Sequence, residues 1–182
     1  MKFTKILCAT LAFSSLSAFA GDDDSLAALA LQRANFTLEQ AIEKVSTDYS
    51  RHITEFEIDD YNHQATYEIE TINFETEQKY KVQVSLENGE VLKERSISLK
   101  VLGLNRLDDD ELFALKELKA ANFNLNKTIA TLKQKYNTNI VEFELESEKG
   151  ISFYKFKLMG EQGAKRVLVD IKTGNIIPVM SH

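Results

Sequence analysis

Two runs of alternating acidic residues are the clearest candidates for chemistry in this sequence. Carboxylates alternate with apolar or hydroxyl side chains at two places, Glu55-Glu57-Asp59 and Glu142-Glu144-Glu146. Closely spaced carboxylates can act as a general acid and base, and they can bind calcium. Alternation with a period of two is also typical of a β-strand that turns one charged face to solvent. The pattern therefore predicts two half-buried strands whose outer faces carry carboxylates.

Basic residues on the neighbouring predicted strands give these carboxylates a structural explanation. Lys155, Lys157 and Arg166 share the outward phase of the second acidic run, and Lys81 faces Glu68 and Glu70 in the first half of the chain. Opposite charges on adjacent strands pair readily, and each such pair contributes little free energy at a surface. We therefore expect two charge-paired sheet faces rather than a catalytic centre.

The sequence contains few other residues that could do chemistry. Its one cysteine, Cys8, lies in the apolar stretch at the N-terminus, and His52, His63 and His182 do not have the spacing of metal ligands. There is no glycine-rich phosphate loop and no HExxH motif. These observations predict a protein that is not an enzyme and that has no cofactor and no metal site.

The strands that hold the acidic runs belong to a unit that occurs twice. The segment Ala34–Leu38 matches Ala121–Leu125, 87 residues later, and Val84–Gly89 matches Val169–Gly174, 85 residues later. Identities and periodicity agree over most of the chain, and the two-residue difference in spacing places an insertion or deletion in a loop. Such self-similarity indicates two copies of one structural module.

Each unit is predicted to contain two helices followed by an antiparallel meander. The first helical stretches are Ser25–Arg33 and Asp110–Ala120, and the second helices begin at the capping residues Thr37 and Asn124. Period-two segments then predict these strands: 54–59, 64–73, 79–86 and 91–99 in the first unit, and 141–146, 152–158, 165–171 and 176–180 in the second. The fold class is therefore α+β, with two tandem repeats that each pack helices on one face of a three- to four-stranded antiparallel sheet.

The N-terminus has the features of an export signal. Lys2 and Lys5 precede a short apolar stretch, and Ala18-Phe19-Ala20 fits a cleavage site. We expect residues 1–20 to be the signal peptide, 21–100 the first repeat, 101–109 a linker and 110–182 the second repeat. The mature chain would then be periplasmic or secreted, and no later segment is apolar for long enough to predict stable membrane insertion.

The acidic charge narrows the range of partners. The sequence has 22 basic and 28 acidic residues, a net charge of −6, and removal of Lys2 and Lys5 with the signal makes it −8. A surface of this charge repels nucleic acid and anionic lipid. We therefore expect no nucleic-acid partner.

Two motifs resemble a known domain family. The capped helix Thr37–Ile42 comes before an acidic strand, and the second unit closes with Val169–Ile177, a strand–turn–strand segment that is similar to the "vDxxTGxv" ending of PepSY domains. The first unit departs from this ending, because Ser85 and Asn88 stand where the family has aspartate and threonine. The resemblance implies a helix packed on an antiparallel sheet. It also implies kinship with the propeptides that hold secreted metallopeptidases inactive, and with free-standing envelope proteins.

The functional hypothesis is an exported, non-catalytic binding module that restrains or senses a partner protein, such as a peptidase. The predicted contact surface contains Glu55, Glu57, Glu142 and Glu144, together with Phe153, which is out of phase with its apolar neighbours and is expected to be an exposed aromatic anchor. The alternative is a periplasmic protein that binds a small ligand or a metal at the acidic sheet faces or in a cleft between the repeats. The sequence leaves the oligomeric state and the relative orientation of the repeats open.

Overall fold

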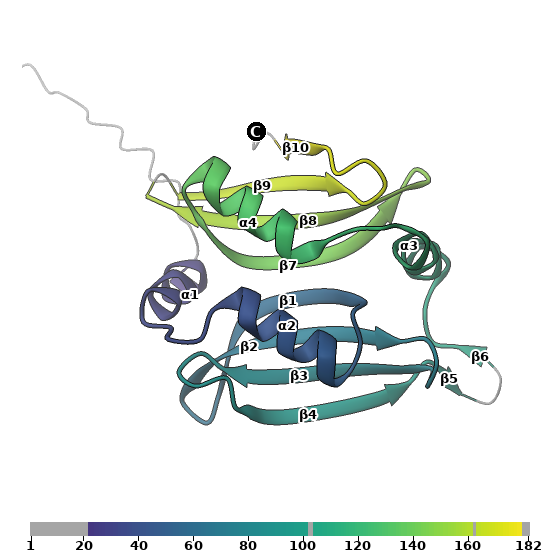
Figure 1. Ribbon diagram of the computed structural model, residues 1–182, viewed down its shortest axis with the longest axis horizontal. Coiled ribbons are helices and arrows are strands. Elements are labelled where there is room, and N and C mark those ends of the chain that lie inside the picture. The colour runs from purple at the N-terminus through teal and green to yellow at the C-terminus, as the bar shows by residue number, and fades with distance from the viewer. Residues whose placement is uncertain (1–21, 102–103, 162, 180–182) are drawn as a thin grey trace, which may run out of the picture.

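The computed structural model describes residues 22–101, 104–161 and 163–179, so the predicted signal peptide, Cys8 and His182 lie outside the described residues. The first repeat contains α1 (Asp22–Gln32), α2 (Leu38–Asp48), β1 (Ile53–Tyr61), β2 (Gln64–Asn73), β3 (Gln78–Ser85) and β4 (Val91–Ser98). The short strands β5 (Lys100–Val101) and β6 (Leu104–Asn105) follow. The second repeat contains α3 (Asp109–Ala120), α4 (Leu125–Tyr136), β7 (Asn139–Glu148), β8 (Ile151–Gly160), β9 (Gly163–Asp170) and β10 (Ile176–Val179). Figure 1 shows the two repeats one above the other, and the predicted α+β class with two tandem repeats is confirmed.

Side chains fix the starts of the helices. Thr37 caps α2, and its hydroxyl accepts from the backbone N–H of Gln40 while the Gln40 side chain accepts from the Thr37 backbone N–H. Asn124 caps α4 through the backbone N–H of Lys127. Each cap satisfies a backbone donor that the helix itself cannot pair. Both predicted caps are therefore confirmed.

The sheets of the two repeats join into one eight-stranded antiparallel sheet. Its strand order is β10-β9-β8-β7-β1-β2-β3-β4, and the join is the pairing of β1 with β7. Phe56 lies opposite Phe143, its counterpart 87 residues later, so an approximate two-fold axis passes between these two residues. The sequence does not specify the relative orientation of the repeats, and this pairing determines it.

One face of the joined sheet carries the apolar core. The helices α2 and α4 lie side by side over this face, as Figure 1 shows. The rings of Phe56 and Phe143 are fully buried here, with 5.3 Å between their centroids. The buried hydroxyl of Tyr154, in the second repeat, donates to the carbonyl of Ile53 in the first. The two repeats therefore share one core.

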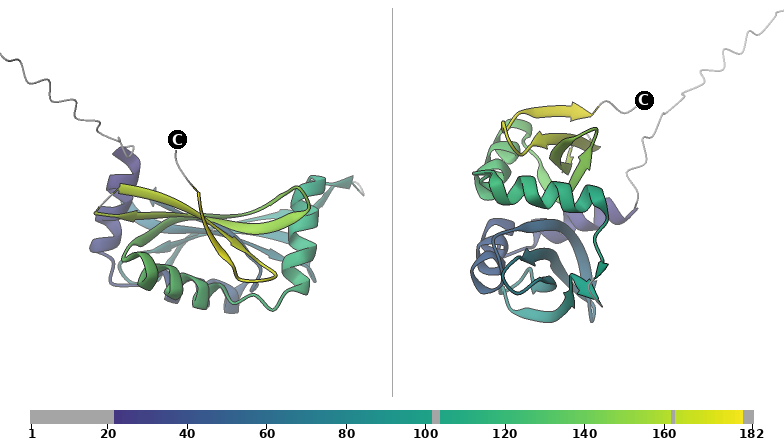
Figure 2. Two further views of the ribbon diagram at one scale, coloured as in Figure 1. Left: turned by 90° about the horizontal axis from the view of Figure 1, so that it is seen from above. Right: turned by 90° about the vertical axis from the view of Figure 1, so that its right-hand side faces the viewer.

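The other two helices stand at the two ends of the sheet. In Figure 2, α1 lies at one end of the strands and α3 at the other, and each runs from one face of the sheet towards the other. Asp24, near the start of α1, contacts Lys157 on the face away from α2 and α4, whereas Leu118, near the end of α3, belongs to the core. We call the face away from α2 and α4 the open face. It is bounded at its two ends by α1 and α3.

Candidate functional site

Six glutamates gather at the centre of the open face. They come from the neighbouring strands β2, β1 and β7. Successive side chains of a strand point to opposite faces of the sheet, so every second residue of these strands lies on the open face. Across the join, Glu55 lies opposite Glu144, and Glu57 lies opposite Glu142. We call this cluster the acidic floor, and its members are Glu55, Glu57, Glu68, Glu70, Glu142 and Glu144. The structure therefore brings together the four glutamates that the sequence predicted as an interaction surface.

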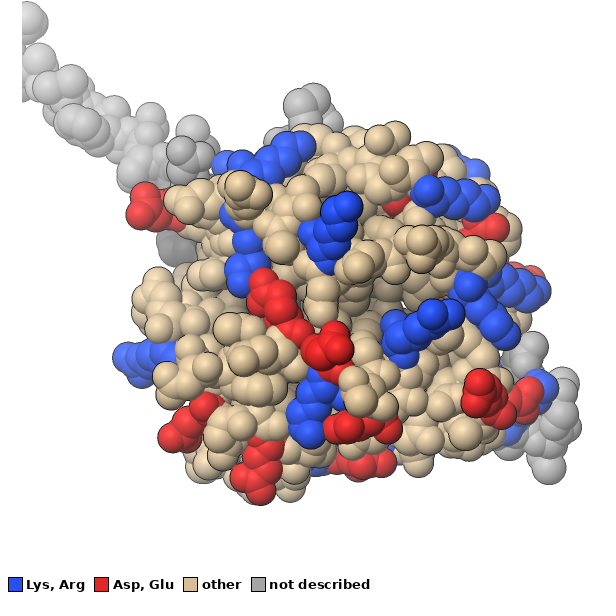
Figure 3. All heavy atoms as spheres, in the orientation of Figure 1, with Lys and Arg blue, Asp and Glu red and all other residues tan. Residues whose placement is uncertain are grey.

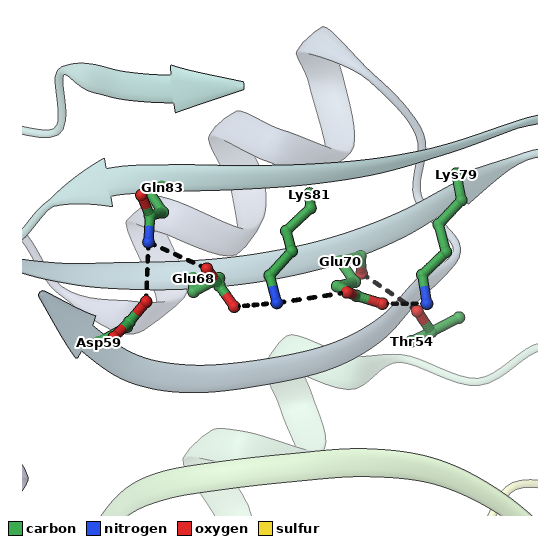
Figure 4. A network of polar contacts seen from close by, with 7 residues as sticks. All are labelled: Thr54, Asp59, Glu68, Glu70, Lys79, Lys81 and Gln83. Carbon is green, nitrogen blue, oxygen red and sulfur yellow. Dashed lines mark hydrogen bonds and ion pairs between the residues drawn. The ribbon is translucent and has the colours of Figure 1, made fainter. Parts of the chain in front are cut away.

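Lysines of β3 pair with the first-repeat edge of the acidic floor. Lys79 forms an ion pair with Glu70, and Lys81 bridges Glu68 and Glu70, with a Lys81 Nζ to Glu70 Oε1 distance of 3.6 Å. Figure 4 shows this chain of contacts running along the sheet. The predicted pairing of Lys81 with Glu68 and Glu70 is confirmed. Although burial lowers the pKa of Lys81, its contacts with Glu68 and Glu70 raise that pKa above its usual value.

Hydrogen bonds from a neutral side-chain amide extend the same network. The Gln83 side-chain amide donates to Asp59 at 2.8 Å and to Glu68 at 2.9 Å (Figure 4). Glu68 and Glu70 are only 7% and 8% exposed. Buried carboxylates need partners of this kind, because an unpaired buried charge is strongly destabilising. These two side chains are therefore held in place by their neighbours and are poorly placed to contact a partner molecule.

The second-repeat edge of the floor is more open. Lys155 Nζ lies 2.7 Å from Glu146, and Lys157 Nζ lies 3.4 Å from Glu142 and 2.5 Å from Asp24 of α1. The Glu142 side chain is nevertheless 46% exposed, and Glu144 is also exposed. On this side the lysines leave carboxylate surface accessible to a partner.

Glu55 and Glu57, between these edges, have unusual acid–base properties. Burial raises the pKa of both carboxyl groups to about 7, and each is raised further by a carboxylate of β2, Glu70 beside Glu55 and Glu68 beside Glu57. Burial, followed by the negative charge of Glu146, also raises the pKa of Glu144. Near neutral pH, Glu55 and Glu57 are therefore only partly ionised, and each can share a proton with its β2 neighbour.

The acidic floor is a surface rather than an enclosed substrate site. The cavity at its end, between α3 and the sheet, has a volume of only about 50 Å³. That space accommodates a few water molecules at most. Within the described residues, no group of three or more histidine, cysteine, aspartate or glutamate side chains is arranged to hold a metal ion. Proton exchange and attraction of cationic groups are the chemistry that this geometry supports.

Phe153 does not have the predicted exposure. Its position on β8, opposite Glu146 and next to the core residue Tyr154, places it on the side of the open face, but it is only 8% exposed. Helix α3 packs against β7 and β8. Met159, near the other end of β8, is also 8% exposed and lies beside Ala28 of α1. The prediction of an exposed anchor was therefore wrong. Strand alternation indicates on which face of the sheet a side chain lies, but it does not show whether a helix at the end of the strand covers that side chain.

The histidines within the described residues lie away from the acidic floor. His52 packs edge-on against Phe74, and burial lowers the pKa of its ring. His63 sits in the turn between β1 and β2 with a positive φ of 65°.

Glu68 and Glu70 were predicted from the sequence only as partners of Lys81, and not as members of the site. The period-two pattern of β2, together with its pairing to β1, was the signal that could have placed them there.

Comparison with known proteins places this arrangement in a family. The family described as "Peptidase propeptide and YPEB domain" (PepSY) matches residues 37–95 and 126–179, one match in each repeat. The chain belongs to the PepSY family. The resemblance inferred from Thr37–Ile42 and Val169–Ile177 is thereby confirmed, and the chain is a tandem PepSY protein.

Two solved structures are similar to this PepSY protein. One is described as a lipoprotein from Clostridium difficile 630; it has 17% sequence identity and a TM-score of 0.47, and the match covers 85% of this chain and 98% of the other. The second is the C-terminal domain of YpeB from Bacillus megaterium, with 16% identity, a TM-score of 0.29, and coverage of 81% and 67%. No curated protein matches the chain. None of the helices in the described ranges is long and apolar enough to cross a membrane.

Proposed function

We propose that this tandem PepSY protein is an extracytoplasmic, non-catalytic regulatory module that binds a partner protein through the open face of its joined sheet. Membership of a family described by peptidase propeptides supports a regulatory role. The charged start, apolar stretch and Ala18-Phe19-Ala20 sequence support export to the periplasm or the medium. A peptidase is the partner class that the family description favours.

The observation that carries this proposal is the excess of carboxylates at the centre of the open face. Six glutamates of the acidic floor face four lysines, which are Lys79, Lys81, Lys155 and Lys157. A lysine- or arginine-bearing segment of a partner would offset the repulsion among the carboxylates and would be guided towards them electrostatically. The exposed side chains of Glu142 and Glu144 are the first that such a segment would contact.

The rest of the surface supports the choice of this face. Figure 3 shows the side that α2 and α4 cover, where acidic and basic side chains are interspersed. The helices on that side are themselves joined by an ion pair between Lys133 and Glu39 at 2.9 Å. The open face has carboxylates at its centre and a helix at each end, so it offers a bounded region for an extended segment.

The test is retention of partners by charge variants of the mature protein. The double variant Glu142→Lys/Glu144→Lys reverses charge on the open face, and Glu87→Lys/Glu90→Lys makes the same change at exposed positions in the β3–β4 turn. Each variant is immobilised and exposed to the extracytoplasmic proteins of the source cells, after circular dichroism has shown that it is folded. We expect a partner that is retained by the wild type and by the turn variant, and lost from the open-face variant.

The peptidase assignment needs a second readout. A retained peptidase is assayed with increasing amounts of wild-type protein, and we expect its activity to fall, with a weaker effect of Glu142→Lys/Glu144→Lys. Equal retention by both variants would show that the open face is not the contact surface. Retention of a protein whose activity is unchanged would remove the inhibitory role and leave a sensing role.

A further inference from the structure

A second cavity lies at the junction of the two repeats, next to the small cavity at the end of the acidic floor, with which it shares Leu107 and Leu115. It has a volume of about 230 Å³ and lies between α3 and the segments that follow β2 and β4. Its apolar lining comes from both repeats and from the connection between them: Phe74, Leu99, Leu107, Leu112 and Leu115. An apolar cavity of about 150 Å³ is large enough to bind benzene. This cavity therefore has room for a longer apolar group.

The edge of this cavity is positively charged. Its polar lining is Glu77, Lys100, Lys116 and Lys119. Lys100 and Glu77 form an ion pair with each other, so their charges cancel. Lys119 lies over the ring of Phe74, with 4.8 Å from its Nζ to the ring centroid, and Lys116 makes no ion pair within the described part of the chain. Two lysine charges thus remain at the edge of an apolar cavity.

We propose that this junction cavity binds a small amphipathic carboxylate of the kind that a medium-chain fatty acid provides. The alkyl chain lies among Phe74, Leu112 and Leu115, and the carboxylate lies between Lys116 and Lys119. Apolar burial supplies most of the affinity, and the two ammonium groups select an anion. Neutral alkyl compounds and cations would gain no charge attraction from the two ammonium groups.

Such a ligand would contact both repeats at once. Phe74 and Leu99 belong to the first repeat, whereas Leu112 and Leu115 belong to α3 of the second. A ligand that binds only the folded, joined form stabilises that form, and the gain in free energy grows with the logarithm of the ligand concentration once this exceeds Kd. The lining of the junction cavity includes no glutamate of the acidic floor, so this inference does not depend on the proposed function.

The experiment is calorimetric titration of the full mature protein with butanoate, hexanoate and octanoate, and with octanol as the neutral control. Each added methylene is expected to strengthen binding by about fourfold, as long as the chain remains inside the cavity. Octanoate is expected to bind more tightly than octanol by about tenfold or more, because the lysines contact only the anion. Equal affinity for octanoate and octanol, or no binding of octanoate, would overturn the proposal.

Matched charge variants locate the site. Lys116→Glu/Lys119→Glu is expected to weaken octanoate binding by about tenfold to a hundredfold. Lys127→Glu/Lys135→Glu, at exposed positions of α4, changes the net charge equally and is expected to leave the affinity unchanged. Equal losses in both variants would show that octanoate responds to net charge alone. A short peptide with a C-terminal leucine that bound where octanoate did not would also overturn the choice of ligand.

Discussion

Removing the ionisable groups at the centre of the acidic floor should make the protein more stable at neutral and alkaline pH. The variant is Glu55→Gln/Glu57→Gln. A glutamine amide has nearly the shape of a protonated carboxyl group and can donate to the neighbouring carboxylates Glu70 and Glu68 as that group does. The variant therefore imitates the protonated state at every pH, and it leaves the paired lysines of β3 in place.

The size and sign follow from the raised pKa values. A change in pKa from 4.5 to about 7 corresponds to an upper limit of about 3 kcal/mol for each group, and partial exposure reduces this to roughly 1–1.5 kcal/mol for each. Between these pKa values the folded protein binds more protons than the unfolded chain, so the free energy of unfolding falls as pH rises from about 4.5 to about 7. We expect the advantage of the variant over the wild type to be smallest at pH 5 and to reach about 2–3 kcal/mol at pH 8.

The assay is urea denaturation followed by circular dichroism at pH 5, 6, 7 and 8. At pH 8, a gain of this size corresponds to a rise in Tm of roughly 4–12 °C for a chain of this length. The control variant, Glu87→Gln/Glu90→Gln, removes two exposed carboxyl groups in the β3–β4 turn and should leave the pH profile unchanged. If the open-face variant and the wild type gave parallel profiles from pH 5 to pH 8, the argument for desolvated, proton-sharing glutamates would be refuted.

Two further substitutions test the packing of the fold. Tyr154→Phe removes the buried hydrogen bond to the Ile53 carbonyl across the repeats. Chemical denaturation should show that the free energy of unfolding falls by about 1–3 kcal/mol. An unchanged free energy would mean that this bond does not hold the repeats together. Gly89→Ala places a Cβ 2.6 Å from the ring of Phe36 at a φ of +74°, whereas Gly150→Ala at a φ of +73° meets open space. Melting curves should show that Gly150→Ala loses about 1 kcal/mol of stability from backbone strain alone, and that Gly89→Ala loses clearly more. Equal losses of stability would show that Phe36 moves aside freely.

Local sequence signals predicted most of the individual elements. The segment Gln64–Asn73 was predicted from its period-two pattern as a strand with the same bounds that β2 has. The capping box of Thr37 and Gln40 marked the start of α2 to the residue. Such signals lie within a few residues of the feature that they specify, so they can be read without knowledge of the tertiary structure.

The features that were missed depend on contacts between distant segments. The pairing of β1 with β7 joins residues that are 85 to 89 positions apart, and neither strand has a local sequence signal that specifies the other as its partner. The same limit explains the short pair β5 and β6 in the predicted linker, and the burial of Phe153 near α3. The raised pKa values of Glu55 and Glu57 also depend on tertiary structure, because they come from burial and from the neighbouring carboxylates of β2, with a smaller effect of Glu144 on Glu55.

The two-fold axis at Phe56 and Phe143 has an evolutionary consequence. Two separate single-unit chains could build the same eight-stranded sheet as a symmetric dimer, with identical residues facing each other across the axis. In such a dimer, the counterparts of Glu68 and Glu70 on β8 would also be glutamates, and eight carboxylates would crowd the centre. The tandem chain has Lys155 and Lys157 at those places, 87 residues after Glu68 and Glu70. Fusion of the two copies therefore permits the halves to diverge in charge, an asymmetry that an assembly of identical subunits cannot have.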